Sequence, residues 1–123
     1  MLSQRRSEYL FYYHLSIVAP SPPENVVAMP LNATVIRVTW SAPATPNGHI
    51  MWYEIQYNVA RSNDVTSIVL SANQLPELKT LIGSLKAFTL YQIRIRAATQ
   101  ERNIKWGNLS LEAEATTHES GML

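Results

Sequence analysis

The sequence predicts an all-β fold, a seven-stranded antiparallel β-sandwich. Apolar residues recur at every second position in several short runs, as they do where the side chains of a strand alternate between its two faces. The clearest run comprises Tyr91, Ile93, Ile95 and Ala97. The interval from Ser21 to Thr117 also matches the ~100 residues of such a sandwich. The chain of 123 residues is therefore interpreted as one domain with its own core.

Seven strands are expected in order along the chain. They lie near Asn25–Met29, Thr34–Ser41, Met51–Asn58, Ser67–Ser71, Leu78–Ile82, Thr89–Thr99 and Leu109–Thr116. Alternation predicts which side chains of the second, third and sixth strands face inward. The inward set is Ile36, Val38, Trp40, Tyr53, Ile55, Tyr57, Tyr91, Ile93, Ile95 and Ala97. The outward set is Arg37, Thr39, Trp52, Glu54, Gln56, Gln92, Arg94 and Arg96.

The domain is expected to begin at the segment Pro20-Ser21-Pro22-Pro23, because proline lacks a backbone donor and holds its neighbour extended. Residues 20–117 are predicted to form the domain, with residues 1–19 as an N-terminal extension and residues 118–123 as a tail.

Two interpretations of the extension stay open. Its two arginines followed by the apolar stretch Tyr9–Ala19 fit a secretory signal. The three tyrosines, His14 and Ser16 within that stretch instead fit a linker, with a short strand at Leu15–Val18. Eleven weakly apolar residues are too few to span a bilayer, which needs about 20 in a helix. Direct membrane insertion by this chain is therefore not expected.

The residues Leu85-Lys86-Ala87-Phe88-Thr89-Leu90-Tyr91 predict a corner between two strands. A tyrosine at its end can bury its ring and still bond a backbone group upstream, an arrangement called a tyrosine corner. The stretch resembles the passage between the fifth and sixth strands of fibronectin type III domains, whose usual pattern is Leu-x-Pro-x-Thr-x-Tyr. Ala87 stands where that proline is expected.

Further segments resemble the same family in the expected order. They are Trp40-Ser41-Ala42-Pro43, Pro46-Asn47-Gly48, Tyr53-x-Ile55-x-Tyr57 and Gly107-Asn108-Leu109-Ser110. The resemblance implies an immunoglobulin-like sandwich of fibronectin type III topology. Its structural signature residues here are Trp40, Tyr53, Leu85 and Tyr91.

Charge and composition exclude several classes of function. A net charge of +1 without any block of like charges is not the footprint of a protein that binds nucleic acid or an anionic membrane. The chain has no cysteine, which excludes disulfides, thiolate metal sites and cysteine nucleophiles. Asp64 is the only aspartate, and His14, His49 and His118 are scattered. No catalytic residue, cofactor or metal site is therefore expected.

Trp52 is one candidate for an interaction surface, because its register places a large aromatic side chain on the outer side beside Arg94 and Arg96. Tryptophan is enriched in interface hot spots, which favours contact with a partner. The alternative is that Trp52 packs sideways on the arginine stems.

The expected loop from Gln100 to Asn108 carries a second candidate group, formed by Arg102, Lys105 and Trp106. Such a loop either contacts a ligand or is an ordinary exposed tip. Trp106 is also predicted to stack on Arg94 or Arg96, with its ring within about 6 Å of a guanidinium group.

The family resemblance implies a non-catalytic interaction or spacer module, one repeat beside others in a larger parent protein. Two settings stay open. The Pro-Asn-Gly form of its second loop favours an extracellular repeat of a membrane-anchored receptor or adhesion protein, and the alternative is an intracellular structural repeat of the muscle-scaffold type. Asn32 and Asn108 begin N-glycosylation triplets, which favour the cell surface. The sequence names no protein partner.

Overall fold

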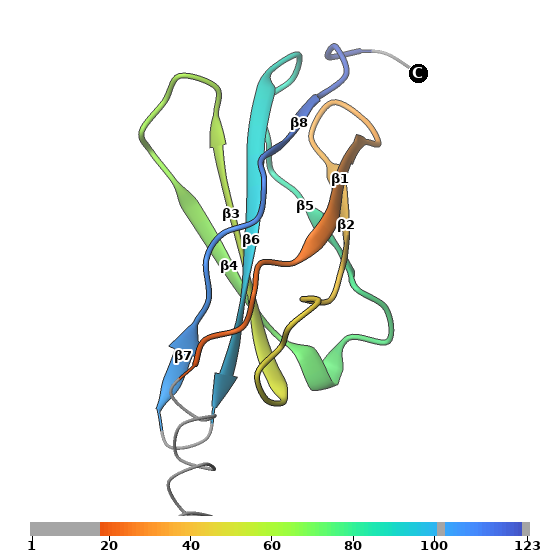
Figure 1. Cartoon of the computed structure of the whole chain (residues 1–123). Coiled ribbons are helices and arrows are strands. Elements are labelled where there is room, and N and C mark those ends of the chain that lie inside the picture. Colours follow the sequence, from red (N-terminus) through yellow and green to blue (C-terminus); the bar gives the residue numbers. More distant parts are fainter. Residues whose placement is uncertain (1–17, 101–102, 122–123) are drawn as a thin grey trace, which may run out of the picture.

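A computed structural model describes residues 18–100 and 103–121 as two antiparallel sheets packed face to face (Figure 1). One sheet has the order β1 (Glu24–Pro30), β2 (Ile36–Ser41), β5 (Lys79–Ile82). The other has the order β4 (Thr66–Ser71), β3 (Ile50–Val59), β6 (Leu90–Gln100), β7 (Ile104–Trp106), and β8 (Ala113–Thr116) also pairs with β6. A 3₁₀ turn, η1 (Ala72–Gln74), follows β4. The predicted all-β antiparallel sandwich is confirmed.

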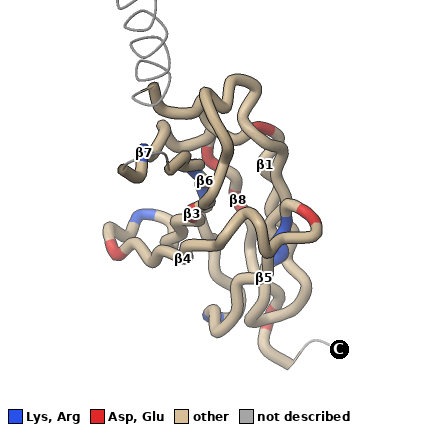
Figure 2. The backbone as a smooth tube through the Cα atoms, turned by 90° about the horizontal axis from the view of Figure 1, so that it is seen from below, with Lys and Arg blue, Asp and Glu red and all other residues tan. Residues whose placement is uncertain are grey.

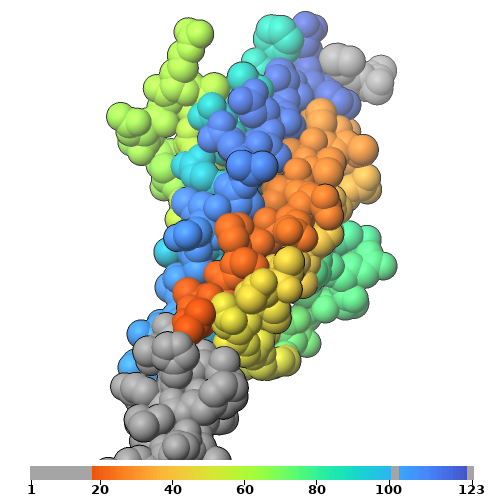
Figure 3. Space-filling view, viewed as in Figure 1, coloured from red at the N-terminus to blue at the C-terminus, as the bar shows by residue number. Residues whose placement is uncertain are grey.

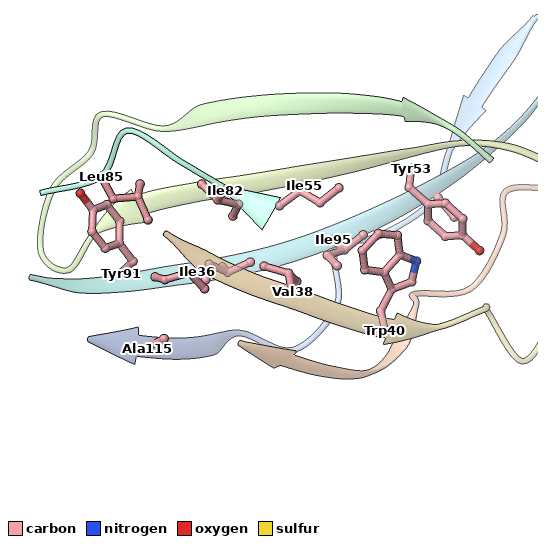
Figure 4. Packing of buried hydrophobic residues seen from close by; sticks show 12 residues of the cluster. Ile36, Val38, Trp40, Tyr53, Ile55, Ile82, Leu85, Tyr91, Ile95 and Ala115 are labelled. Carbon is pink, nitrogen blue, oxygen red and sulfur yellow. The ribbon is translucent and has the colours of Figure 1, made fainter. Parts of the chain in front are cut away.

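The core lies between the sheets and is built from the alternating apolar positions of the central strands (Figure 4). Ile36, Val38 and Trp40 of β2 are buried, as are Ile93 and Ile95 of β6. The predicted inward set is confirmed: its members are buried except Tyr57, which is half-buried and packs against the core. Burial raises the pKa of the Tyr53 phenol, whose ring meets the Trp40 ring edge-on at a centroid distance of 5.3 Å.

The tyrosine corner forms at the start of β6. The Tyr91 side chain is 5% exposed, and its hydroxyl oxygen accepts a 2.9 Å hydrogen bond from the backbone N–H of Lys86. Where the family usually has proline, the backbone oxygen of Ala87 accepts a 2.8 Å bond from the Thr89 hydroxyl. A side-chain hydrogen bond thus braces the bend without a proline ring.

The predicted last strand, Leu109–Thr116, is wrong in its first half. Strand β8 begins only at Ala113, and β7 precedes it at Ile104–Trp106. Trp106 pairs with Ala98 and Ala113 pairs with Ile93. The chain therefore advances seven residues from Trp106 to Ala113, while β6 covers the same distance with five residues. The surplus residues bulge out between the two strands.

Ser110 is the reason that the ladder is interrupted there. Its hydroxyl oxygen accepts a 2.9 Å hydrogen bond from the Ile95 N–H, and its own N–H donates to the Ile95 carbonyl at 2.8 Å. The Ser110 hydroxyl oxygen thus accepts the hydrogen bond that a backbone carbonyl would accept in a regular ladder. A pattern of apolar alternation gives no sign of this replacement.

The N-terminal segment runs along this bulged part of the chain, as the adjoining red-orange and blue surfaces of Figure 3 show. An open groove of about 760 Å³ separates residues 21–26 from residues 109–112. Among the described residues that line it, only Glu24 and Glu112 carry a charge.

The structure also bears on the Pro46-Asn47-Gly48 segment and on the expected N-terminal extension. Asn47 and Gly48 have φ angles of 55° and 140°, a left-handed backbone that glycine adopts without steric cost. The extension up to residue 17, including most of the short strand expected at Leu15–Val18, lies outside the described residues. Within the described part of the chain, no helix is long and apolar enough to cross a membrane.

Candidate functional site

The predicted outward aromatic and charged residues gather on the outer face of the five-stranded sheet. We call the group formed by Trp52, Glu54, Arg96, Ala98 and Trp106 the Trp–Arg face. Register places Trp52 and Trp106 on either side of Ala98. Ala98 is 0% exposed although it lies on an outer face, because a large indole stands on each side of this small residue.

Arg96 occupies the centre of the Trp–Arg face. Its guanidinium carbon lies 4.6 Å from the centroid of the Trp106 ring, within the range of a cation–π contact. Its Nε donates a 2.7 Å hydrogen bond to Glu54 Oε1, and the two side chains form an ion pair. The predicted stacking of Trp106 on an outward arginine is confirmed, with Arg96 as the partner.

Glu54 lies on the predicted outward face but is shielded from solvent. It is buried and accepts hydrogen bonds from Arg96 at 2.7 Å and from Gln56 at 2.8 Å. Burial by itself raises the pKa of the Glu54 carboxyl, but the hydrogen bonds from Gln56 and Arg96 and the Arg96 charge together lower this pKa below its usual value. Glu54 is therefore a charged residue held within the Trp–Arg face.

Arg94 points to the same side of the sheet and is also paired. Its Nη1 lies 3.4 Å from Glu112 Oε1 across the bulged last segment. Both outward arginines of β6 thus have carboxylate partners within the chain.

Trp52 lies half-buried at the edge of the Trp–Arg face. Its indole N–H donates a 3.2 Å hydrogen bond to the side-chain oxygen of Gln100. Its cross-strand neighbours are Ser71 on β4 and Ala98 on β6. Both neighbours are small, and the indole is partly accessible to solvent.

Two members of the second predicted group lie in a strand and not in the expected loop. Lys105 and Trp106 belong to strand β7, where they pair with Thr99 and Ala98 of β6. The sequence Ile104-Lys105-Trp106 contains β-favouring residues on either side of the lysine, a signal that could have placed a strand there. Arg102 lies outside the described residues.

The two glycosylation triplets differ in local geometry. Asn32 is exposed, and its amide oxygen accepts hydrogen bonds from the Thr34 N–H at 2.9 Å and from the Thr34 hydroxyl at 3.3 Å. Asn108 is also exposed, but the hydroxyl of its triplet partner Ser110 is held between Ile95 and Leu111.

The two described histidines lie at separate places in the fold. His49 Nε2 lies 3.4 Å from Asn73 Oδ1, while His118 bonds the β1–β2 turn through its backbone N–H. Across residues 18–100 and 103–121, no group of three histidine, aspartate or glutamate side chains is placed to hold a metal ion.

The fold is an antiparallel two-sheet sandwich braced by a tyrosine corner, and the charged residues of its Trp–Arg face are paired within the chain. A family model described as "Fibronectin type III domain" matches residues 21–110. The chain belongs to the fibronectin type III family, whose single domain is typically a non-catalytic module.

Relatives with similar modules include interleukin-6 receptor subunit beta of Homo sapiens, which is 26% identical over 120 residues, 96% of this chain and 13% of the relative. Protein sidekick-2 of Mus musculus is 31% identical over 100 residues, 80% of this chain and 4% of that protein. The chain thus spans a small fraction of the length of either relative. The crystal structure of the FN5 domain of Drosophila Lar superimposes with a TM-score of 0.65 at 25% identity, covering 83% of this chain and 100% of that domain.

Proposed function

We propose that this chain is a non-catalytic protein-interaction or spacer module of an extracellular, membrane-anchored receptor or adhesion protein. The observation that carries the proposal is the family membership together with the likeness to a module of interleukin-6 receptor subunit beta over 96% of the chain. The exposed Asn32 triplet supports passage through the secretory pathway. Neighbouring repeats within a longer parent belong to the same proposal, because the matched relatives are many times longer than this chain.

Glycan occupancy tests the extracellular setting. The protein is isolated from native tissue and treated with an amidase that converts each glycosylated asparagine to aspartate, and the peptides that contain Asn32 and Asn108 are then mapped by mass spectrometry. We expect conversion at Asn32 or Asn108. Protein that carries no glycan at either site and fractionates with intracellular filaments would favour the muscle-scaffold alternative.

The folding unit that we propose is residues 20–117, with 1–19 and 118–123 as flanking segments. At its start the Ser21 N–H donates to the Thr45 carbonyl at 2.9 Å. At its end Thr117 is 1% exposed, and its hydroxyl donates to the Lys86 carbonyl at 2.6 Å. A fragment of residues 20–117 is expected to unfold cooperatively with the same free energy as the full chain. A fragment that stops at residue 112 loses β8 and is expected not to fold.

Within this module, the accessible side of the Trp–Arg face is a proposed contact surface for a protein partner. Trp52 is the residue to test, because the other outward residues are already engaged. Arg94 is paired with Glu112, and Arg96 contacts both Glu54 and Trp106. Changing Arg94, Arg96 or Trp106 is expected to destabilise the sheet. Lys105 and Arg102 are secondary candidates. Trp52→Ala is expected to lose binding to the physiological partner with an unchanged circular dichroism spectrum. Retained binding would assign Trp52 a packing role.

A further inference from the structure

The opposite outer face, on the three-stranded sheet, carries a different pattern of side chains. Met29, Arg37 and Leu81 form one cross-strand row, since Arg37 of β2 pairs with Met29 of β1 and with Leu81 of β5. The next row is Val27, Thr39 and Lys79. We call these six residues the Arg37 face.

The apolar members of the Arg37 face are exposed. The exposed fractions are 52% for Val27, 47% for Met29 and 58% for Leu81. Val27 and Met29 lie on the edge strand β1 and Leu81 lies on the edge strand β5, so apolar side chains flank Arg37 on both sides. Large apolar side chains gathered on one exposed face are more informative than single ones, because such patches mark interaction sites.

Arg37 lacks the partners that the other strand arginines have. Its Nη2 lies 3.2 Å from the Met29 sulfur, and a thioether is only a weak acceptor. No carboxylate of the described residues lies within ion-pair distance of it, whereas Arg94 and Arg96 each have one. Lys79 is paired with Glu77 at 2.9 Å. Figure 2 colours the backbone by residue type, with basic positions in blue and acidic positions in red on several strands and loops. Arg37 and Lys79 are the two basic residues of the Arg37 face.

We propose that the Arg37 face docks a protein partner that presents a carboxylate surrounded by apolar side chains. None of the six side chains on the face is acidic, so the positive charge of Arg37 is complemented from outside. A carboxylate can accept two parallel hydrogen bonds from a guanidinium group, and these charge-assisted bonds are the strong ones. Burial of Val27, Met29 and Leu81 by the partner removes water around the ion pair and supplies the apolar contact typical of an interface centre.

This inference rests on the proposed function as an interaction module, and it names the chemistry of a partner for a second face. The experiment uses the ¹⁵N-labelled full chain and a simple probe of that chemistry, hexanoate, followed by the amide resonances in two-dimensional NMR. Hexylammonium, which has the same alkyl chain with the opposite charge, is the matched control.

We expect hexanoate to produce saturable shifts at residues 27–29, 37–39 and 79–82, and hexylammonium to produce none there. Arg37→Gln is expected to weaken hexanoate binding at least about tenfold, which corresponds to about 1.4 kcal/mol, because it removes the charge-assisted hydrogen bonds to the carboxylate. Arg61→Gln, which removes an exposed arginine elsewhere, is expected to leave the shifts unchanged.

Three results would overturn the proposal. The first is equal binding of hexanoate by the Arg37→Gln protein. The second is a set of shifts centred on Arg94 and Arg96 instead of Arg37. The third is a dependence of the same resonances on protein concentration without probe, which would make a second copy of this chain the occupant. The outcome is independent of glycan occupancy, so this inference and the extracellular setting fail or succeed separately.

Discussion

The guanidinium group of Arg96 lies between the Trp106 ring, at 4.6 Å from its centroid, and the Glu54 carboxylate, at 2.7 Å. Strands β3, β6 and β7 each contribute one of these three side chains. The contact therefore joins three strands on the outer side of the sheet, in addition to the backbone ladder.

The Arg96–Trp106 contact is expected to stabilise the domain measurably. Free energies of unfolding are measured in denaturant for Trp106→Leu, Arg96→Gln and the double variant. The coupling energy is expected to be about 0.5–1 kcal/mol, the range for a partly exposed cation–π pair. A matched cycle of Trp106→Leu with Arg37→Gln on the opposite sheet should show a coupling below about 0.5 kcal/mol. Equal coupling in both cycles would contradict the stacking.

Tyr91→Phe removes the hydroxyl that accepts the Lys86 N–H. We expect the free energy of unfolding to fall by about 0.5–1.5 kcal/mol through the lost hydrogen bond, with hexanoate binding unchanged. Tyr57→Phe is the comparison, because no hydrogen bond joins the Tyr57 hydroxyl to another described residue, and its cost should stay within about 0.5 kcal/mol. If Tyr91→Phe abolished hexanoate binding without lowering the free energy of unfolding, the tyrosine corner would have a functional role instead.

The lowered pKa of Glu54 predicts a pH dependence of stability. An unfolded glutamate has a pKa of about 4.3, so between that pH and the lower pKa of the folded state the unfolded chain binds more protons. The contribution of Glu54 is complete above about pH 5 and is lost as the pH falls through the pKa of the folded state. The difference in free energy of unfolding between the natural protein and Glu54→Gln should therefore shrink from about pH 6 to about pH 3. A constant difference would rule out this origin.

Phe88 holds a left-handed backbone conformation, with φ of 47°, while its side chain is 69% exposed. This conformation costs a bulky L-residue about 1–2 kcal/mol, and asparagine tolerates it better. Phe88→Asn is therefore expected to raise the free energy of unfolding by about 0.5–1 kcal/mol. Leu111→Asn, at a side chain that is 92% exposed, is the control and should change it by less than about 0.5 kcal/mol. A destabilised Phe88→Asn protein would show that the ring makes contacts worth more than the strain.

Gly107 allows the N-terminal segment to lie against β7. A β-carbon at this position would overlap the carbonyl oxygen of Pro20, whereas one at Gly83 would meet nothing within 4 Å. Gly107→Ala is expected to cost about 1–3 kcal/mol through the forced displacement. Gly83→Ala should be neutral or slightly stabilising, by up to about 1 kcal/mol. Thermal unfolding of the two variants side by side makes the comparison, and equal midpoints would contradict it.

Much of the fold could be predicted because its signals are local. Alternation along β2 placed Ile36, Val38 and Trp40 in the core, and the Leu85–Tyr91 stretch predicted the corner. The broken last strand could not be predicted, because Ser110 enters the ladder through its hydroxyl, and hydroxyl groups bond backbone equally well in loops. Lys105 and Trp106 were also assigned to a loop, although the β-favouring residues Ile104 and Trp106 are a local signal for the strand that pairs with β6.

The candidate site was predicted in part. Register alone placed Trp52, Arg94 and Arg96 on the outer side, and Trp106 was predicted to stack on one of the two arginines. Register could not tell which arginine has which partner. Glu54 and Arg96 are 42 positions apart in sequence, and only the pairing of β3 with β6 sets them opposite one another.

The sequence by itself determined the class of the fold and the inward or outward direction of the central strand residues, because alternation in a strand is a property of neighbouring residues. Only the tertiary structure decided which outward charges are free. It pairs Arg94 with Glu112 and Arg96 with Glu54 across strands, and it leaves Arg37 among exposed apolar side chains without a carboxylate from the described residues. Ion pairing depends on distances of a few ångströms between residues far apart in the chain, and those distances exist only after the strands have paired.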